Sequence, residues 1–266
     1  MITLASASGN VFAYLWAQEA PAAFDGPRWA RRLGRRGEGL GVDGLFLLEP
    51  YAGGRPWTLT HWDPDGSQSF CSNGTRAAAA LLEPGSKGNI PALVSGEAVL
   101  LRLEESGEVG LRLPEGPGYG LSAVALDLPF PHGYGWTGTP HLVVEVPDTE
   151  TFDLATFGPI HRRHAALPHG ANVSVVTLTA PGAARIRTWE RGVEGETLCC
   201  GQGCAVAGAW LSSRTGVRSW RFQPLGEDPV RVDLQPDPAT GWRDLWLSGP
   251  VRNLGRLQPG PGLGLG

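Results

Sequence analysis

The chain of 266 residues is poor in several residue types, and each shortage excludes a class of protein. Lysine occurs once, at Lys87, against 21 arginines, and it stands among turn-forming residues. A Schiff-base enzyme needs a desolvated lysine, so pyridoxal-phosphate chemistry is not expected. No apolar run approaches the ~18 residues of a membrane span. With a net charge of −4 and no basic stripe, we expect neither a membrane nor a nucleic-acid partner.

Cysteine is also scarce, with four residues in all: Cys71, Cys199, Cys200 and Cys204. The first 23 residues lack a cationic start and are interrupted by Gly9-Asn10, so they predict a strand and turn rather than a signal peptide. A cytoplasmic protein without structural disulfides is therefore expected. The group at 199–204 lacks CxxC spacing and a nearby histidine, so no metal is expected. Packing is the expected role of Cys199 and Cys204.

The same pattern occurs twice in the chain, which indicates two homologous halves. Cys71 and Cys200 are 129 positions apart, and each precedes a run of small residues. Three further pairs keep this spacing: Gly9-Asn10 with Gly138-Thr139, Gly41-Val42-Asp43 with Gly170-Ala171-Asn172, and Gly66 with Gly195.

Periodicity predicts strands and one helix in each half. The helices are expected at 75–82 and 205–211, and the strands at 99–103, 109–113, 142–146, 230–234 and 245–247. We predict an α/β (α+β) fold with a linker at 115–120. Residues 1–118 form the half with the first cysteine, and residues 119–266 form the half with the second. The segment from about 250 is expected to pack back on the first half, and the Gly/Pro-rich end at 259–266 is expected to fray.

Both cysteines are expected at the start of a helix, where the positive end of the dipole stabilises a thiolate. The backbone N–H groups of the same helix start can hold a carboxylate. Two such thiols suit inversion of a carbon centre, because one removes a proton while the other returns one to the opposite face. Inert buried thiols, or a thiol protein that binds metal or cycles a disulfide, remain the alternatives.

Two segments resemble the motifs of the diaminopimelate epimerase family. Residues Cys71-Ser72-Asn73-Gly74-Thr75-Arg76 are similar to its C-G-N-G-x-R motif. The segment from Glu190 to Gly203 is similar to its E-R-G…G-E-T-x-A-C-G-[ST]-G motif. The resemblance implies a cofactor-free epimerase that is a cytoplasmic homodimer acting on a small amino acid in lysine biosynthesis. It also implies two pseudo-symmetric domains, each a barrel-like, mostly antiparallel sheet around a central helix, with the active site in the cleft between them.

The resemblance also implies roles for individual residues. Cys71 and Cys200 would be the acid/base pair, and His141 and Glu190 would tune the thiols. Asn10, Asn172 and Arg191, with the Glu190 backbone, would hold the distal end of the substrate and its flanks. Backbone N–H groups at Ser72, Asn73, Gly201 and Gln202 would hold the reacting carboxylate.

Two departures from the family motifs affect the expected substrate. Asp63 and Thr139 stand at substrate-binding positions where the family has asparagine. An ionised aspartate cannot donate a hydrogen bond to a carboxylate and repels it. We therefore expect inversion of LL-diaminopimelate to the meso isomer, with a racemase or epimerase of another α-amino acid, such as one with a cationic tail, as the alternative.

Overall fold

The computed structural model describes residues 1–50, 56–82, 88–167 and 169–265, which form two compact units. Unit 1 contains residues 1–111 and 250–266, and unit 2 contains residues 112–249. Lys87, for which a solvated turn is predicted, lies outside the described residues. No helix in the described ranges is both long and apolar enough to cross a membrane.

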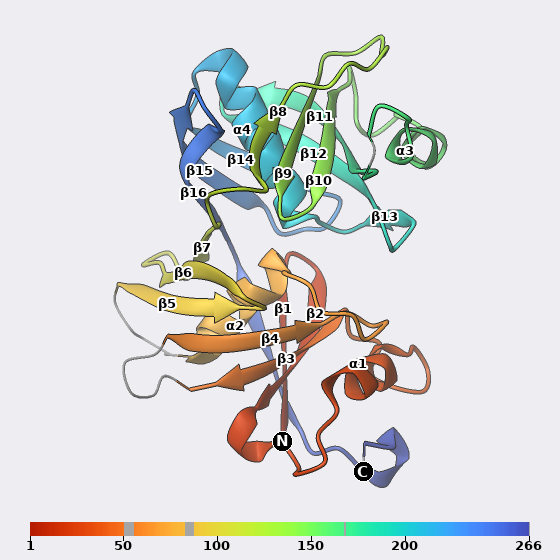
Figure 1. Cartoon of the computed structure of the whole chain (residues 1–266), viewed down its shortest axis with the longest axis vertical. Helices are drawn as coiled ribbons and strands as arrows, with labels where there is room; N and C mark the ends of the chain where they lie inside the picture. Colours follow the sequence, from red (N-terminus) through yellow and green to blue (C-terminus); the bar gives the residue numbers. More distant parts are fainter. Residues whose placement is uncertain (51–55, 83–87, 168, 266) are drawn as a thin grey trace. The chain divides into compact units, whose positions relative to one another are not determined.

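In unit 1, strands curl around one buried helix (Figure 1). Its elements are β1 (Ile2–Ala7), β2 (Asn10–Trp16), η1 (Ala17–Glu19), α1 (Gly26–Gly34), β3 (Gly44–Glu49), β4 (Trp57–Trp62), α2 (Ser72–Leu82), β5 (Asn89–Val94), β6 (Glu97–Leu103), β17 (Val251–Leu257) and η2 (Pro261–Leu263). The strands pair in the order β17, β1, β2, β3, β4, β5, β6, with β2–β3 and β4–β5 parallel and the other pairs antiparallel. Since α2 packs against both β17 and β6, the two ends of this series, the sheet wraps around it.

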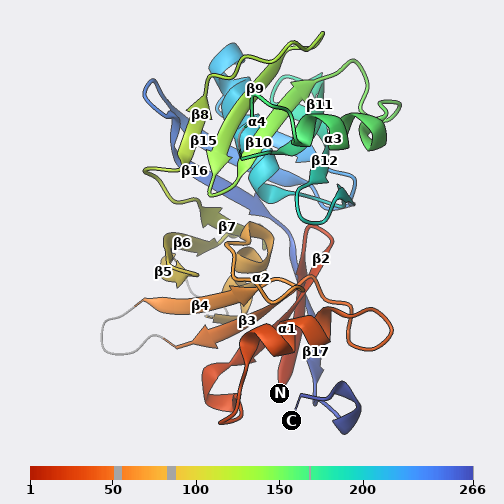
Figure 2. The same ribbon diagram turned by 45° about the vertical axis from the view of Figure 1, so that its right-hand side comes forward.

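Unit 2 repeats this arrangement (Figure 2). Its elements are β8 (Tyr119–Ser122), β9 (His132–Thr137), β10 (Pro140–Glu145), α3 (Leu154–Arg162), β11 (Asn172–Ala180), β12 (Ala183–Glu190), β13 (Gly195–Thr197), α4 (Gly201–Thr215), β14 (Ser219–Gln223), β15 (Val230–Asp237) and β16 (Gly241–Gly249), while β7 (Val109–Arg112) runs across the division. The pairs β10–β11 and β12–β14 are parallel, as are β2–β3 and β4–β5. With α4 packed against both β8 and β16, the predicted α/β fold with a central helix in each half is confirmed.

The small residues of the two helices are explained by the surrounding strands. A Cβ on Gly74 would lie 2.3 Å from the Phe46 ring, and one on Gly208 would lie 2.8 Å from Val232. A helix enclosed on all sides needs small or apolar residues where strands pass close to it, and any polar side chain that it buries needs a partner. Both helices begin earlier than predicted, at Ser72 and Gly201, because burial outweighs the poor helix propensity of their first residues.

Two local predictions are wrong. Tyr119 and Gly120, assigned to the linker, belong to β8, where the Leu121 N–H donates to the Thr240 carbonyl at 2.7 Å. The Gly/Pro-rich tail does not fray over its described residues. Arg32 donates to the carbonyls of Gly262 and Leu263 at 3.0 and 2.9 Å, and Leu265 joins the apolar core of unit 1. Hydrogen bonds from a helix side chain thus order a segment whose composition predicts disorder.

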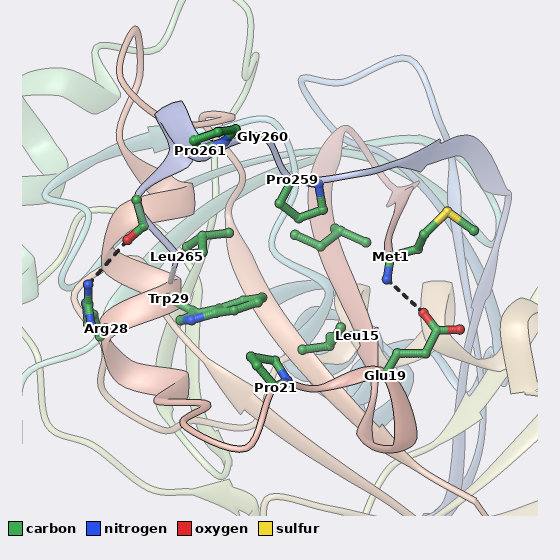
Figure 3. A pocket seen from close by; sticks show the side chains of 12 residues that line it. Met1, Leu15, Glu19, Pro21, Arg28, Trp29, Pro259, Gly260, Pro261 and Leu265 are labelled. Atoms are coloured by element: carbon green, nitrogen blue, oxygen red, sulfur yellow. Dashed lines mark hydrogen bonds and ion pairs between the residues drawn. The ribbon is translucent and has the colours of Figure 1, made fainter.

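This tail also lines an open cavity of about 690 Å³ in unit 1 (Figure 3). Trp29, Leu15 and Leu265 line it, and the Met1 ammonium pairs with Glu19 at its edge. The cavity lies where β1 begins and β2 ends, so it occupies the end of the strands opposite Asn10. None of the predicted site residues lines it.

Candidate active site

In unit 1, the predicted site residues gather at one edge of the sheet. Asn10 begins β2, and Asp43 precedes the parallel strand β3. The antiparallel strand β4 ends at this same edge, directly before Asp63. Cys71 stands immediately before α2 and is half-buried, with its carbonyl accepting from both the N–H and the hydroxyl of Thr75 at 2.9 and 2.7 Å. These bonds hold the cysteine backbone against the first turn, where the helix dipole favours a thiolate.

A directed chain of hydrogen bonds runs from a buried arginine to this edge. Arg76 is fully buried and donates to Ser8 Oγ at 2.6 Å and to Asn73 Oδ1 at 3.2 Å. Asn73 Nδ2 then donates to Asn10 Oδ1 at 2.9 Å, and Asn10 Nδ2 donates to Asp43 at 3.4 Å. A guanidinium only donates and a carboxylate only accepts, so the two ends orient both amides.

A buried tyrosine also contacts this helix start. Tyr14 is buried and donates to the Gly74 carbonyl at 2.8 Å. Burial first, and then the charge of Cys71, raise the pKa of Tyr14, whereas the Arg76 cation lowers it. Sequence analysis assigned no role to Arg76 in unit 1.

His61, also without a predicted role, connects the two ends of the loop that carries Asp63 and Cys71. Its fully buried ring stacks on Phe46 with centroids 4.5 Å apart, and its Nδ1 lies 3.2 Å from both the carbonyl and the hydroxyl oxygen of Ser69. Nε2 lies 4.0 Å from the Asp63 carboxylate. Burial lowers the pKa of His61, although Asp63 opposes this. The sequence did contain one signal for a role of His61. It precedes Cys71 by ten residues, which is the spacing between Glu190 and Cys200.

Unit 2 brings its predicted residues to the corresponding edge. Cys200 is the N-cap of α4 and is 9% exposed, and its carbonyl accepts from the Cys204 N–H at 3.0 Å. The parallel strands β10 and β11 pair His141 with Asn172, and β12 ends at Glu190. Both neighbouring thiols, Cys199 and Cys204, are buried.

The buried side chains of His141 and Asn172 form one cluster with the half-buried Thr139. His141 is completely buried, with Nε2 3.0 Å from Thr139 Oγ1 and 3.4 Å from Asn172 Nδ2. Asn172 Oδ1 accepts from the Arg191 N–H at 2.7 Å. Burial first, and then the Arg191 cation, lower the pKa of His141 to about 3, so the ring is neutral at ordinary pH.

The remaining predicted residues of unit 2 have protein partners of their own. Glu190 accepts from the Thr197 hydroxyl at 2.5 Å, and Gln202 donates to the Thr137 carbonyl. The exposed Arg191 donates from Nη1 to the His169 carbonyl at 2.7 Å. Among the described residues, no group of three or more His, Cys, Asp or Glu side chains is arranged to hold a metal ion.

Comparison with solved structures defines the class of fold. A probable proline racemase from Agrobacterium radiobacter K84 superposes with a TM-score of 0.70 at 15% identity, covering 98% of this chain and 94% of the other. A hydroxyproline epimerase from Agrobacterium vitis gives 0.64 at 15% identity, covering 96% and 89%. A phenazine biosynthesis protein of the PhzF family from Bacillus anthracis gives 0.68 at 14% identity, covering 95% and 96%. The fold is therefore one that racemases, epimerases and PhzF proteins share.

Sequence comparison identifies the family. The diaminopimelate epimerase of Gemmatimonas aurantiaca is 32% identical, over 90% of this chain and 89% of the relative. That of Rhodospirillum centenum is 34% identical, over 80% and 78%. The family model for diaminopimelate epimerase matches residues 134–234. The chain belongs to the diaminopimelate epimerase family, and it is an isomerase of the amino-acid epimerase and racemase class.

Proposed function

We propose that this enzyme inverts the α-carbon of LL-diaminopimelate to give the meso isomer, with Cys71 and Cys200 as the acid/base pair and no cofactor. The observation that carries the proposal is the repeated helix start, because each cysteine directly precedes a buried helix at an equivalent position. The relatives at 32–34% identity, named diaminopimelate epimerases, support the choice of substrate.

In the proposed reaction, the thiolate of one cysteine takes the α-proton while the thiol of the other delivers a proton to the opposite face. The two cysteines exchange protonation states, so the reverse reaction uses them in exchanged roles. Backbone N–H groups at Ser72, Asn73, Gly201 and Gln202 would stabilise the carboxylate as negative charge develops beside it. Asn10, Arg191 and the Glu190 backbone would hold the distal end.

A second candidate substrate is an α-amino acid with a cationic tail. Asp63 favours it, because its side chain is 36% exposed and, among the described residues of unit 1, is hydrogen-bonded to no arginine. A carboxylate attracts an ammonium group and repels the distal carboxylate of diaminopimelate.

The test is exchange of the α-proton in D2O. The full chain is incubated with LL- and meso-diaminopimelate and with L-lysine, L-ornithine, L-arginine and L-alanine, and loss of the α-proton signal is followed by NMR. We expect exchange with diaminopimelate and interconversion of its isomers. Exchange confined to lysine, ornithine or arginine would select the second candidate, and no exchange with any amino acid would overturn both. The Cys71→Ala, Cys200→Ala double variant, which lacks both proposed acid/base groups, is the negative control.

A further inference from the structure

The buried imidazole of His141 is held so that one ring nitrogen must carry its proton. Its Nε2 faces Thr139 Oγ1 and Asn172 Nδ2 at 3.0 and 3.4 Å. Its Nδ1 is buried without a hydrogen-bond partner among the described residues. The protonation of this ring follows from the direction of the bonds around it.

The orientation of Asn172 is set by a backbone group. The Arg191 N–H can only donate, so the Asn172 atom that it meets at 2.7 Å must be the oxygen. The amide nitrogen of Asn172 therefore faces His141, and that nitrogen can only donate. It follows that Nε2 of His141 is the acceptor, and the Thr139 hydroxyl can rotate to donate to the same nitrogen.

A neutral imidazole whose Nε2 accepts carries its hydrogen on Nδ1. The ring is neutral because it is completely buried and because the charge acting on it, that of Arg191, is positive. The Nδ1–H is thus a buried donor, and a group of this kind is normally paired in a functional state. The Nδ1–H therefore suits an acceptor that is present only when an amino acid is bound or when a cysteine is ionised.

We propose that His141 is a neutral hydrogen-bond donor whose Nδ1–H takes an anionic acceptor, and that Asn172 is the positioning residue that holds this tautomer. The acceptor is the carboxylate of the bound amino acid or a cysteine thiolate. The proposal rests on the proposed function and makes two expected roles more specific. His141, expected to tune the thiols, acts as a donor and not as a base, and the amide of Asn172, expected at the substrate, also orients the imidazole.

The tautomer is measured directly by NMR of the full chain labelled with 15N-histidine. At pH 7 we expect His141 to show a protonated Nδ1 and an unprotonated Nε2, and a protonated Nε2 would overturn the proposal. Asn172→Asp keeps an acceptor for the Arg191 N–H but turns an acceptor toward Nε2, so Nε2 must gain a proton. Thr139→Val is the matched control and keeps the original tautomer, because Asn172 still donates. An unchanged tautomer in Asn172→Asp would contradict the proposed lock.

Activity separates a donor from a base. The side-chain nitrogen of asparagine can take the place of Nδ1, so His141→Asn should keep α-proton exchange within about tenfold of the wild type. His141→Leu offers no donor and should lose about 10²-fold, as for other single donors to developing charge. Equal losses in the two variants, both shown to be folded by thermal melting, would contradict the donor role. If no amino acid exchanges at all, the proposed function fails, while the tautomer remains measurable.

Two further measurements identify the acceptor. Where it is the substrate carboxylate, adding diaminopimelate shifts the Nδ1–H proton resonance, and the shift survives in the Cys71→Ala, Cys200→Ala double variant. Where it is a thiolate, the resonance of the free enzyme changes as the thiols titrate, and this change disappears in the double variant. A resonance that responds to neither condition would overturn the proposal.

Discussion

The two units share a framework of strands around one buried helix and differ in the polar side chains that this framework carries. Both have a buried helix behind a cysteine, and both have a glycine in the left-handed region before the strand at the site, with φ of +68° at Gly41 and +65° at Gly170. At the same spacing of 129, the polar positions have diverged into the pairs Ser8 and Thr137, Asn10 and Thr139, Phe12 and His141, Asp43 and Asn172, His61 and Glu190, and Arg76 and Ala205. The two units thus share a backbone arrangement and differ in the chemistry of their polar groups.

The divergence places two identical thiols in unlike surroundings. Unit 1 buries the permanent charge of Arg76 behind its helix start, where unit 2 has Ala205. Unit 2 buries a neutral imidazole, His141, where unit 1 has Phe12. The helix dipole acts on both cysteines alike. A difference between the two thiols must therefore come from side chains such as these. A two-base inversion requires one thiolate and one thiol, and unlike surroundings are a means of obtaining them from equal residues.

The largest effect is expected from removing either cysteine. Cys71→Ala and Cys200→Ala should each lower net inversion by at least about 10³-fold, because inversion needs a proton carrier on each face. Chiral chromatography of diaminopimelate isomers measures this loss. Cys204→Ala, at a buried position in α4, is the control for helix packing. Rapid inversion by either catalytic variant would mean that the two units are not partners in one reaction.

Acid stability compares the buried histidines of the two units. The pKa of His141 is about 3 in the folded chain against ~6.5 when unfolded, so the unfolded state binds more protons between these values. The contribution of His141 to stability is then fully present above pH 6.5 and falls by about 1.4 kcal/mol for each pH unit between about 6.5 and 3. His61 acts in the same direction, but Asp63 opposes the lowering of its pKa.

Urea denaturation between pH 7 and 5 measures how steeply the free energy of unfolding falls with pH. This fall should be shallower in His141→Leu than in the wild type, and His61→Leu should change it by a smaller amount. The variant His169→Gln, at an exposed position, is the control for the removal of one imidazole. An acid slope that His141→Leu leaves untouched would show that the imidazole is charged or exposed in the folded chain.

Much of the framework could be predicted from the sequence, because it depends on local pattern. The repeat of Cys71 at Cys200 predicts two equivalent helix starts, alternating apolar residues predict β6 and β15, and a nearly continuous apolar run predicts β10. The helix boundaries could not be placed, since the first residues of α2 and α4 are weak helix formers whose conformation is imposed by the enclosing strands.

The site was less predictable than the frame. Motif residues such as Asn10, Asn73 and Asn172 could be named, but their partners could not. The contact of Arg76 with Ser8 joins positions 68 apart, and that of Arg191 with Asn172 joins positions 19 apart. Such contacts follow from strand register and from the direction of buried donors, neither of which is expressed in motif spacing.

The equivalent glycines allow a test of the shared framework. Alanine in the left-handed region costs about 1 kcal/mol, and this applies to both Gly41→Ala and Gly170→Ala. A new Cβ at Gly41 meets the flexible Arg36 side chain at 3.2 Å and the Arg36 Cα at an ordinary contact distance of 3.8 Å. At Gly170 it meets the Arg162 carbonyl at 2.9 Å, which the Ala171 N–H already holds at 3.0 Å. The free energy of unfolding should fall by about 1 kcal/mol in the first variant and about 2 kcal/mol in the second. Equal losses would mean that the second turn relaxes freely.

The smallest effect is expected at Asp63, a position where unit 2 has Gly192 and no charge. Asp63→Asn should raise kcat/KM for diaminopimelate about fivefold and lower it for any cationic-tailed substrate by a similar factor. The effect is modest because the carboxylate is 36% exposed, and solvent screening limits such charges to about 1 kcal/mol.

A matched control lies two residues along the same loop. The Asp65 carboxylate accepts from the N–H and hydroxyl of Ser67 at 2.8 and 2.6 Å, so Asp65→Asn perturbs the turn while leaving the charge of Asp63 in place. This variant should leave the ratio of kcat/KM for diaminopimelate and L-lysine unchanged, whereas Asp63→Asn shifts it. A ratio that moves equally in both variants would assign the selectivity to loop conformation, and a ratio that moves in neither would place Asp63 away from the bound amino acid.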